Sequence, residues 1–295
     1  MTPTNDYVFH RIFGRKKNEE ITKGLIGAII KQEIKTISID ENPITEKNIK
    51  DDKVGVLDIK ARLNNNIVCD VEMQVAKQDN IEKRIMFYWS KVYTAEIQEG
   101  EDYGVLKRTI VILIANFKLD QLKEISKFHT KWQIREEEYR KIILTDTLEF
   151  HILELPKLKK QLKENKLDKK DKIAIWSTFL LNPENVGDEI MEENEDIKLA
   201  KEELEKIKKD KQEQRLAELR MKHILDQNSI RNSGIREGLE KGIKQGIEQG
   251  KKEGIKQGKK AEKIEIAQKL INLKMPIEQI IEITGLTEEE IKNIK

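Results

Sequence analysis

The fold of this chain is decided by residues 56–75, which read VLDIKARL, then NNN, then IVCDVEMQV. Both arms alternate apolar and polar side chains, which is the period-2 pattern of half-buried strands. The pattern predicts a β-hairpin with one apolar face and one mainly polar face. The apolar face holds Leu57, Ile59, Ala61, Leu63, Ile67, Cys69, Val71, Met73 and Val75, and the opposite face holds Asp58, Lys60, Arg62, Val68, Asp70, Glu72 and Gln74.

The turn of the hairpin sets its register. The run Asn64–Asn66 is expected to form the loop, because asparagine tolerates the positive φ angles of tight turns. With three residues in the loop, Leu63 pairs with Ile67 and Ala61 pairs with Cys69. A loop of two or four residues would give a different register.

This register places charged groups opposite each other on the polar face. Lys60 faces Asp70 as a cross-strand ion pair, whereas Asp58 faces Glu72, and like charges about 5 Å apart repel. A divalent cation would relieve the repulsion, since Mg²⁺ commonly binds one or two carboxylates together with substrate phosphates. Gln74 adds an amide on the same face. The alternative is an ordinary solvent-facing strand surface, on which charged residues are common.

Beyond the hairpin, several segments resemble a known family in the same order. They are NDYVFHRIFG at 5–14, VEMQ at 71–74, KRIMFYWSKVYTAEIQEGEDYGVLKRTIVILI at 83–114 and KGIKQGIEQGKKEGIKQGKK at 241–260. An Asp on one strand, Glu-X-Gln on the next, and a following helix with Arg and Tyr are similar to the PD-(D/E)XK nuclease superfamily. Within it, the chain resembles the Rpn-type recombination-promoting nucleases and transposases. The resemblance implies an α/β fold, a restriction-endonuclease-like mixed sheet flanked by helices, and a metal-dependent DNA endonuclease.

The resemblance also suggests roles for individual residues. Asp58 and Glu72 would hold Mg²⁺ or Mn²⁺, with the Met73 carbonyl as a further ligand, and the ion would activate the water that attacks phosphorus. Arg84 would hold the scissile phosphate, and Tyr88 lies one helical turn further along the same face. The structural alternatives are a surface ion pair for Arg84 and a core position for Tyr88.

Gln74 stands where the superfamily usually has a lysine. An amide cannot supply a positive charge or accept a proton from water, although it can orient that water. The resembled Rpn branch also has glutamine at this place, and Lys60 on the same face could supply the missing charge. The alternative function is a non-catalytic DNA-binding or oligomeric assembly protein with a degenerate nuclease site.

Composition limits the partners and the compartment. The chain has 56 basic and 54 acidic residues, so any DNA-binding surface must be a local patch. Cys69 is the only cysteine, which excludes a disulfide framework and a multi-cysteine zinc site, and we expect it to be a small buried hydrophobe. Four scattered histidines predict neither a zinc site nor a histidine base. No apolar run reaches membrane-spanning length and no signal-peptide core is present, which favours a cytoplasmic protein without membrane contact.

Strands and helices are expected to alternate up to residue 155. Asn5 or Asp6 would cap the first helix, and Asp6 is also a functional candidate because the resembled family begins with a similar helix near its site. The later helix is expected to be capped by Asp79, with Glu82 completing a capping box, and to stop at Gly100. Its buried stripe would hold Ile81, Ile85, Tyr88, Val92 and Ala95. The predicted helices span 5–13, 17–32 and 79–99, and the predicted strands lie near 36–39, at 109–115, within 131–138 and at 149–155.

The C-terminal part is expected to be helical. A helix at 168–181 would pack on the sheet, and a charged helix would follow from 188 to about 225. Seven glycines then recur every fourth residue from Gly234 to Gly258, most of them followed by Ile or Leu. Each glycine costs up to about 1 kcal/mol of helix stability, so the repeat is either disordered or a helix stabilised by self-association, which would make the chain a homo-oligomer.

The last residues resemble a helix-turn-helix. Met275-Pro276 would open one helix, Gly285 would form the turn, and Thr287 would cap a second helix with Glu290 three residues on. Because this second helix begins with three glutamates, which repel phosphates, packing or oligomerisation is favoured over base recognition. The predicted division is a nuclease domain at 1–182, a charged helical linker at 183–230 and a glycine-repeat tail at 231–295.

Overall fold

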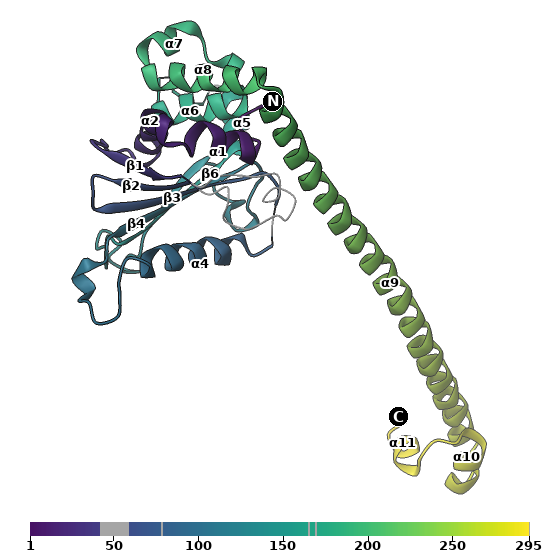
Figure 1. Ribbon diagram of the computed structural model, residues 1–295. Helices are drawn as coiled ribbons and strands as arrows, with labels where there is room; N and C mark the ends of the chain where they lie inside the picture. Colours follow the sequence, from purple (N-terminus) through teal and green to yellow (C-terminus); the bar gives the residue numbers. More distant parts are fainter. Residues whose placement is uncertain (42–58, 78, 165, 169, 295) are drawn as a thin grey trace. The chain divides into compact units, whose positions relative to one another are not determined.

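The computed structural model describes residues 1–41, 59–77, 79–164, 166–168 and 170–294 (Figure 1). The chain forms two compact units, Met1–Asn228 and Ser229–Lys295. The division predicted from the sequence, with a linker between boundaries at 182 and 230, stays a prediction. In the described part of the chain, no helix combines the length and the apolar character that crossing a membrane requires.

A six-stranded mixed sheet forms the centre of the first unit, with strand order β1-β2-β3-β4-β6-β5. The inner strands β3, β4 and β6 are parallel to one another, and the remaining neighbours are antiparallel. The strands are β1 (Ile37–Asp40), β2 (Ile59–Leu63), β3 (Ile67–Gln74), β4 (Arg108–Ala115), β5 (His129–Trp132) and β6 (Leu148–Glu154). This architecture confirms the predicted α/β fold with a mixed sheet and flanking helices.

The hairpin formed by β2 and β3 has the predicted register. Leu63 pairs with Ile67, and Lys60 lies directly across from Asp70. Asn64 and Asn65 adopt positive φ angles of 50° and 64° in the turn. The Asn64 side chain also accepts hydrogen bonds from the main chain just before β1, at the nitrogens of residues 35 (2.8 Å) and 36 (3.2 Å), which fixes the turn to the neighbouring segment.

Helices cover both faces of the sheet (Figure 1). The helix α4 (Ile81–Thr94) lies on one face, where it packs on apolar side chains of β4 and β6. The opposite face carries α1 (Asp6–Phe13), α2 (Glu19–Ile30), α5 (Leu155–Lys163), α6 (Lys172–Leu181) and α8 (Glu195–Lys209). Because both faces are covered, β3, β4 and β6 are buried over almost their full length.

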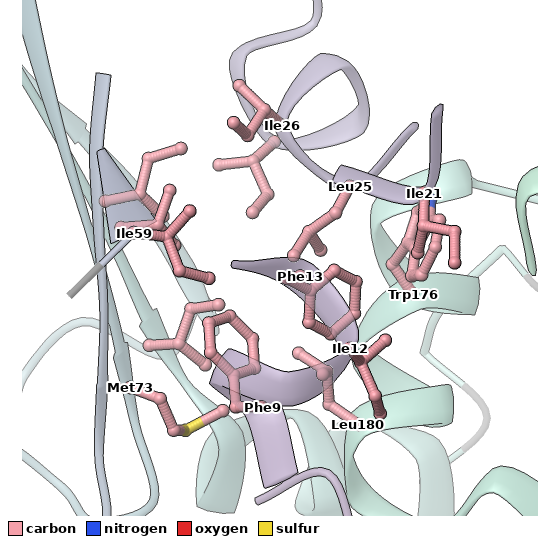
Figure 2. Close-up of a cluster of buried hydrophobic side chains, with 14 of the residues drawn as sticks. Phe9, Ile12, Phe13, Ile21, Leu25, Ile26, Ile59, Met73, Trp176 and Leu180 are labelled. Carbon is pink, nitrogen blue, oxygen red and sulfur yellow. The ribbon is translucent and has the colours of Figure 1, made fainter. Parts of the chain in front are cut away.

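The larger core lies between the sheet and the helices α1, α2 and α6. Figure 2 shows Phe9 and Phe13 of α1 between the strand residues and Trp176 of α6, with the Met73 side chain directed at Phe9. All of these side chains are almost completely buried, and each contributes about 1.5–3 kcal/mol relative to an exposed position. Cys69 belongs to the same cluster, as predicted.

The helix α4 differs from its prediction. It spans Ile81–Thr94 rather than 79–99, and Asp79 does not cap it. Asn80 occupies the N-cap position in the left-handed conformation (φ 56°) without a side-chain capping bond, so the chain enters the helix one residue later than expected. Gly100 lies in a later turn. The fully buried residues of α4 are Ile81 and Ile85, whereas Tyr88 and Val92 are half-buried and Ala95 is exposed.

Other predicted elements also differ in their bounds. The strand expected within 131–138 is β5, which begins at His129 and ends at Trp132. The single charged helix expected over 188–225 is three helices, α7 (Asp188–Glu193), α8 and α9 (Lys211–Asn272). Extended backbone at Asp210 separates α8 from α9, and the Asp210 side chain accepts hydrogen bonds from main-chain nitrogens at the start of α9.

The glycine repeat is helical, because α9 runs through all seven glycines. A Cβ atom added at any of them would meet open space. The apolar residues of the repeat face solvent, with exposed fractions of 52–67% at Ile235, Leu239, Ile243, Ile247 and Ile255. The helix therefore presents an apolar stripe that nothing in the described chain covers.

The second unit ends in the predicted pair of short helices, α10 (Ile277–Thr284) and α11 (Glu288–Lys292). Gly285 ends α10 in the left-handed conformation, and Thr287 with Glu290 forms the predicted capping box of α11. A small core of Ala267, Ile280, Leu286 and Ile291 holds these helices against the end of α9.

Candidate active site

The polar face of β3 is directed at α4. Asp70 and Glu72 are almost completely buried, and Gln74 is half-buried at the end of the strand. They alternate with Val71 and Met73, whose side chains pack in the larger core on the other face. The hairpin pattern therefore correctly indicated which face of β3 carries the polar groups.

Glu72 is the centre of the predicted site, and its carboxylate has an exposed fraction of 0%. Gln74 Nε2 donates a hydrogen bond to Glu72 Oε2 at 3.2 Å. Arg84 Nε lies 3.7 Å from the same oxygen, from the first turn of α4. Three of the residues predicted to form the site are thus brought together by two adjacent elements, β3 and α4.

Tyr88 lies beside Arg84 on α4. The Arg84 guanidinium carbon stands 4.9 Å from the centre of the Tyr88 ring, which is a cation–π contact. Tyr88 is half-buried, so the expectation that it belongs to the core is wrong. The contact holds the guanidinium between an aromatic face and the Glu72 carboxylate, which restricts its freedom of movement.

Met73 can offer only its main chain to the site. Its side chain is 5% exposed and packs in the larger core (Figure 2). Met73 pairs with Ile114 of β4 on one side of β3. On the other side, the pairing with β2 that the structure describes ends at Ile59 and Val71, before Met73. A role for the Met73 carbonyl as a metal ligand stays a prediction.

Two further predicted residues belong to β2 or its approach. Lys60 is exposed and lies across from the buried Asp70, and an ion pair between them stays a prediction. Asp58 lies outside the described residues, and so does its expected pairing with Glu72.

A divalent cation suits the groups that are present. Among the described residues, no three or more side chains of His, Cys, Asp and Glu are grouped so that they could hold a metal ion. The site nevertheless offers a buried carboxylate at Glu72, an amide at Gln74 and a main-chain carbonyl at Met73, which are the oxygen donors that Mg²⁺ prefers. Soft or imidazole-binding metals would find no matching ligand in this set.

Asp6 is not part of this site. Asn5 caps α1 by accepting a hydrogen bond from the main-chain nitrogen of Val8, so the capping role expected for Asn5 or Asp6 belongs to Asn5. Asp6 instead forms an ion pair with Arg220 at 2.8 Å. It lies on α1, on the face of the sheet opposite to α4.

The sequence patterns missed one polar cluster in the first unit. The structure brings His129 of β5 and His151 of β6 together, and both lie near the buried Glu149. Alternation along β6 places Glu149 and His151 on one face, which the sequence could have indicated. Their contact with His129 depends on the pairing of β5 with β6, for which no local pattern gives a signal.

Comparisons with known proteins place the chain in a nuclease family. A family model described as PD-(D/E)XK nuclease family transposase matches residues 3–234. A second model, described as the C-terminal HTH domain of the Rpn/YhgA-like nuclease family, matches residues 260–295. Comparison with curated proteins and with solved structures gave no match.

Proposed function

Because this chain belongs to the PD-(D/E)XK nuclease family transposases, we propose that it is a metal-dependent endonuclease that hydrolyses phosphodiester bonds in DNA. The observation that supports the proposal most directly is the buried Glu72 carboxylate, contacted by Gln74 at 3.2 Å and by Arg84 at 3.7 Å. Burying a carboxylate is costly, so its position beside groups suited to phosphate chemistry favours a functional role.

Asp58 and Glu72 hold the metal ion in this proposal, with the Met73 carbonyl as a third ligand. A bound Mg²⁺ or Mn²⁺ would polarise the phosphodiester and lower the pKa of a coordinated water. Gln74 donates to Glu72 through its amide nitrogen, which leaves its carbonyl oxygen to accept a hydrogen bond from the attacking water and to orient it.

Arg84 binds the scissile phosphate in this proposal. Its guanidinium already lies between Glu72 and Tyr88, so little conformational entropy is lost when it engages the phosphate. Lys60, exposed on the same face of the hairpin, supplies a second positive charge. These two cations stand in for the lysine that Gln74 replaces.

The second unit contributes to DNA binding in this proposal. Its match to an HTH domain, together with its two short helices joined by the turn at Gly285, favours DNA as the partner. The first turn of α11 is acidic at Glu288–Glu290, which disfavours phosphate contacts there. Glu288 and Glu290 pair with lysines, at 2.6 Å and 2.7 Å, which offsets part of this charge.

Plasmid cleavage tests the catalytic proposal. Purified protein is incubated with supercoiled plasmid and Mg²⁺ or Mn²⁺, beside Glu72→Gln, Asp58→Ala and the exposed control Glu99→Gln. We expect the first two substitutions to reduce cleavage by about 100-fold or more, the usual effect of removing a group that stabilises charge in the transition state. The control should cleave like the unchanged protein.

A metal titration by calorimetry completes the test. The unchanged protein should bind Mn²⁺ at a site that both Asp58→Ala and Glu72→Gln abolish, and Glu99→Gln should retain. Equal nicking by all four proteins would identify a contaminating nuclease and would refute the catalytic proposal.

One observation favours the alternative, a DNA-binding protein with a degenerate site. The Arg84 guanidinium already provides a positive charge beside Glu72, which is the charge that a metal ion would otherwise supply. The alternative predicts that the protein binds DNA in a gel shift while it neither cleaves plasmid nor binds Mn²⁺.

A further inference from the structure

A small hairpin continues beyond the edge strand β5, in the connection between β5 and β6. It comprises residues 132–144, and we call it the arm; β5 is the last strand in the order of the sheet. Leu144 N donates a hydrogen bond to Ile134 O at 3.1 Å, and Glu136 N donates one to Ile142 O at 3.2 Å. An antiparallel bridge lies between these two bonds. The register of the arm is therefore defined, with Leu144 across from Ile134 and Ile142 across from Glu136.

One face of β5 and the arm is polar and is bound to the sheet. Lys131 Nζ and Gln133 Nε2 lie 3.0 Å and 3.1 Å from Oε2 of the buried Glu149. Arg135 Nη2 in turn donates a hydrogen bond to Gln133 Oε1 at 2.7 Å. Successive side chains of an extended segment alternate between two faces, so these contacts assign Lys131, Gln133 and Arg135 to one face.

The other face of the arm is apolar and exposed. Trp132 and Ile134 alternate with the polar residues, and Leu144 and Ile142 share their face because residues directly across an antiparallel pair point to the same side. The exposed fractions are 41% for Trp132 and Ile134, 58% for Ile142 and 77% for Leu144. These four large side chains form what we call the apolar strip of the arm.

An exposed strip of this kind indicates a contact surface. A two-stranded hairpin is at best marginally stable in water unless one of its faces is packed. Contiguous exposed apolar side chains with a polar rim usually mark a site of interaction with another molecule. The arm also stands at the edge of the sheet, where a second chain can approach.

The charges of the arm indicate the kind of partner. Three consecutive glutamates, Glu136–Glu138, are exposed at its tip, and they disfavour nucleic acids and anionic membranes because they repel phosphates. Arg135, Arg140 and Lys141 balance them within the same arm. A surface with an apolar centre and equal numbers of both charges can complement a two-fold copy of itself, since the cations of one copy can meet the acids of the other.

We propose that the arm is a self-association surface that pairs with the arm of a second copy of this chain around a two-fold axis. In this contact the two apolar strips cover each other and the charged rims pair. A standard interface buries about 800 Å² on each partner, whereas one apolar strip consists of four side chains. The contact is therefore weak by itself, and a further contact between the same two copies, for which the exposed stripe of α9 is available, strengthens it.

The arm is separate from the proposed nuclease site. It joins β6 at Leu148, which pairs with Thr109 of β4, and Thr109 pairs with Val68 near the start of β3. Glu72 and Gln74 lie toward the opposite end of β3. None of the residues to which metal binding or cleavage is assigned belongs to the arm, so the two proposals can fail separately.

Cysteine cross-linking of the full-length protein tests which surface the two copies share. Cys69 is the only cysteine and is buried, so an introduced cysteine is the only accessible thiol. With a short bifunctional maleimide, Leu144→Cys should give a covalent dimer. Ser38→Cys, at an exposed position of β1 on the opposite edge of the sheet, is the control and should stay monomeric. Addition of Glu72→Gln to Leu144→Cys should leave the yield unchanged.

Sedimentation of the full-length protein measures the strength of the contact. Leu144→Glu and Ile142→Glu should each raise the dissociation constant by about tenfold or more, because an unpaired carboxylate is costly to bury. Leu144→Met keeps the apolar volume and should associate like the unchanged protein. Met86→Glu makes a similar change at a 46% exposed position of α4 and should have no effect. Circular dichroism should show that all variants fold, since the substituted positions are exposed.

Three results would overturn the proposal. The first is a cross-linking yield for Leu144→Cys that does not exceed the yield for Ser38→Cys. The second is self-association of Leu144→Glu and Ile142→Glu that is as strong as that of Met86→Glu. The third is loss of DNA binding by Leu144→Glu in a gel shift without any change in self-association, which would assign the arm to nucleic acid instead.

Discussion

At the scale of single residues, Arg84 links the two halves of the proposed nuclease site. It reaches from α4 to the Glu72 carboxylate on β3, and its guanidinium rests on Tyr88. Both contacts can persist while the guanidinium also binds a phosphate, because it has five N–H donors. The residue is therefore suited to couple phosphate binding to the state of Glu72, the proposed metal ligand.

Replacement of Arg84 should separate binding from chemistry. Arg84→Ala should lower the cleavage rate at saturating DNA by about 100-fold, since it removes a charge that stabilises the transition state. Arg84→Lys should recover only part of the rate, because an ammonium group lacks the planar fork. Cleavage kinetics measure the effect on chemistry, and a gel shift measures the effect on DNA binding. Lys83→Ala, at an exposed neighbouring position, is the control. Equal losses in Arg84→Ala and Lys83→Ala would mean that only general charge matters.

The sequence predicted that Glu72 and Gln74 share a face of one strand, but it did not predict the histidine pair. Alternation and one turn length were sufficient to place Glu72 and Gln74 on one face of β3, because both signals are local, whereas the covering of that face by α4 was not predicted. His129 and His151 come from segments that pair across the sheet edge, and their sequences carry no mark of that pairing. Long-range pairing of this kind is decided by the packing of the whole sheet.

At the scale of elements, the start of α9 is fastened to α1 through Glu213. The Tyr7 hydroxyl donates to Glu213 at 2.6 Å, and the guanidinium groups of Arg11 and Arg15 bind the same carboxylate. Burial, together with the hydrogen bond to Glu213, raises the pKa of Tyr7. One carboxylate thus neutralises two cations at the contact between these helices.

Loss of this carboxylate should destabilise the first unit. Glu213→Ala leaves Arg11 and Arg15 close together without their shared anion, and we expect a cost on the order of 2 kcal/mol, between the values for exposed and buried ion pairs. Thermal unfolding followed by circular dichroism measures the change. Glu218→Ala, at an exposed position of the same helix, is the matched control. A loss no larger than that of the control would show that the cluster contributes little.

Element boundaries show where local signals are insufficient. Asn80 and Asp210 lie where α4 and α9 begin. Asn80 adopts the left-handed conformation without a side-chain capping bond, whereas Asp210 is extended and its side chain accepts hydrogen bonds from the start of α9. A helix-favouring sequence around Asp210 hid the break between α8 and α9. The existence and type of these elements followed from periodicity, whereas their ends depended on tertiary packing.

At the scale of the whole molecule, the glycine repeat presents an exposed apolar stripe that a second helix could cover. The five Ile and Leu side chains of the repeat are more than half exposed, and the seven glycines carry an intrinsic helix cost. Close packing between two such helices would cover the apolar stripe and would use the open space around the glycines. These observations support the proposal that the tail mediates self-association.

Two truncations test this proposal and separate the repeat from the HTH segment. A chain that ends at residue 233 should show a lower oligomeric state in light scattering than the full-length protein. A chain that ends at residue 259 retains the repeat and should keep the assembly, while it loses the part of the DNA affinity that the HTH segment provides. An unchanged mass for the shorter chain would refute self-association through the repeat.

The asparagine turn between β2 and β3 also constrains how this protein can evolve. Gain or loss of one residue there would shift the register of β2 against β3 by one residue. Lys60 and Arg62 would then face the apolar layer, and Ile59 and Ala61 would leave it. The residue types in the turn can change, but insertions or deletions of one residue would be selected against. Related sequences should therefore vary in the residue types of this loop, but their loop lengths should not differ by a single residue.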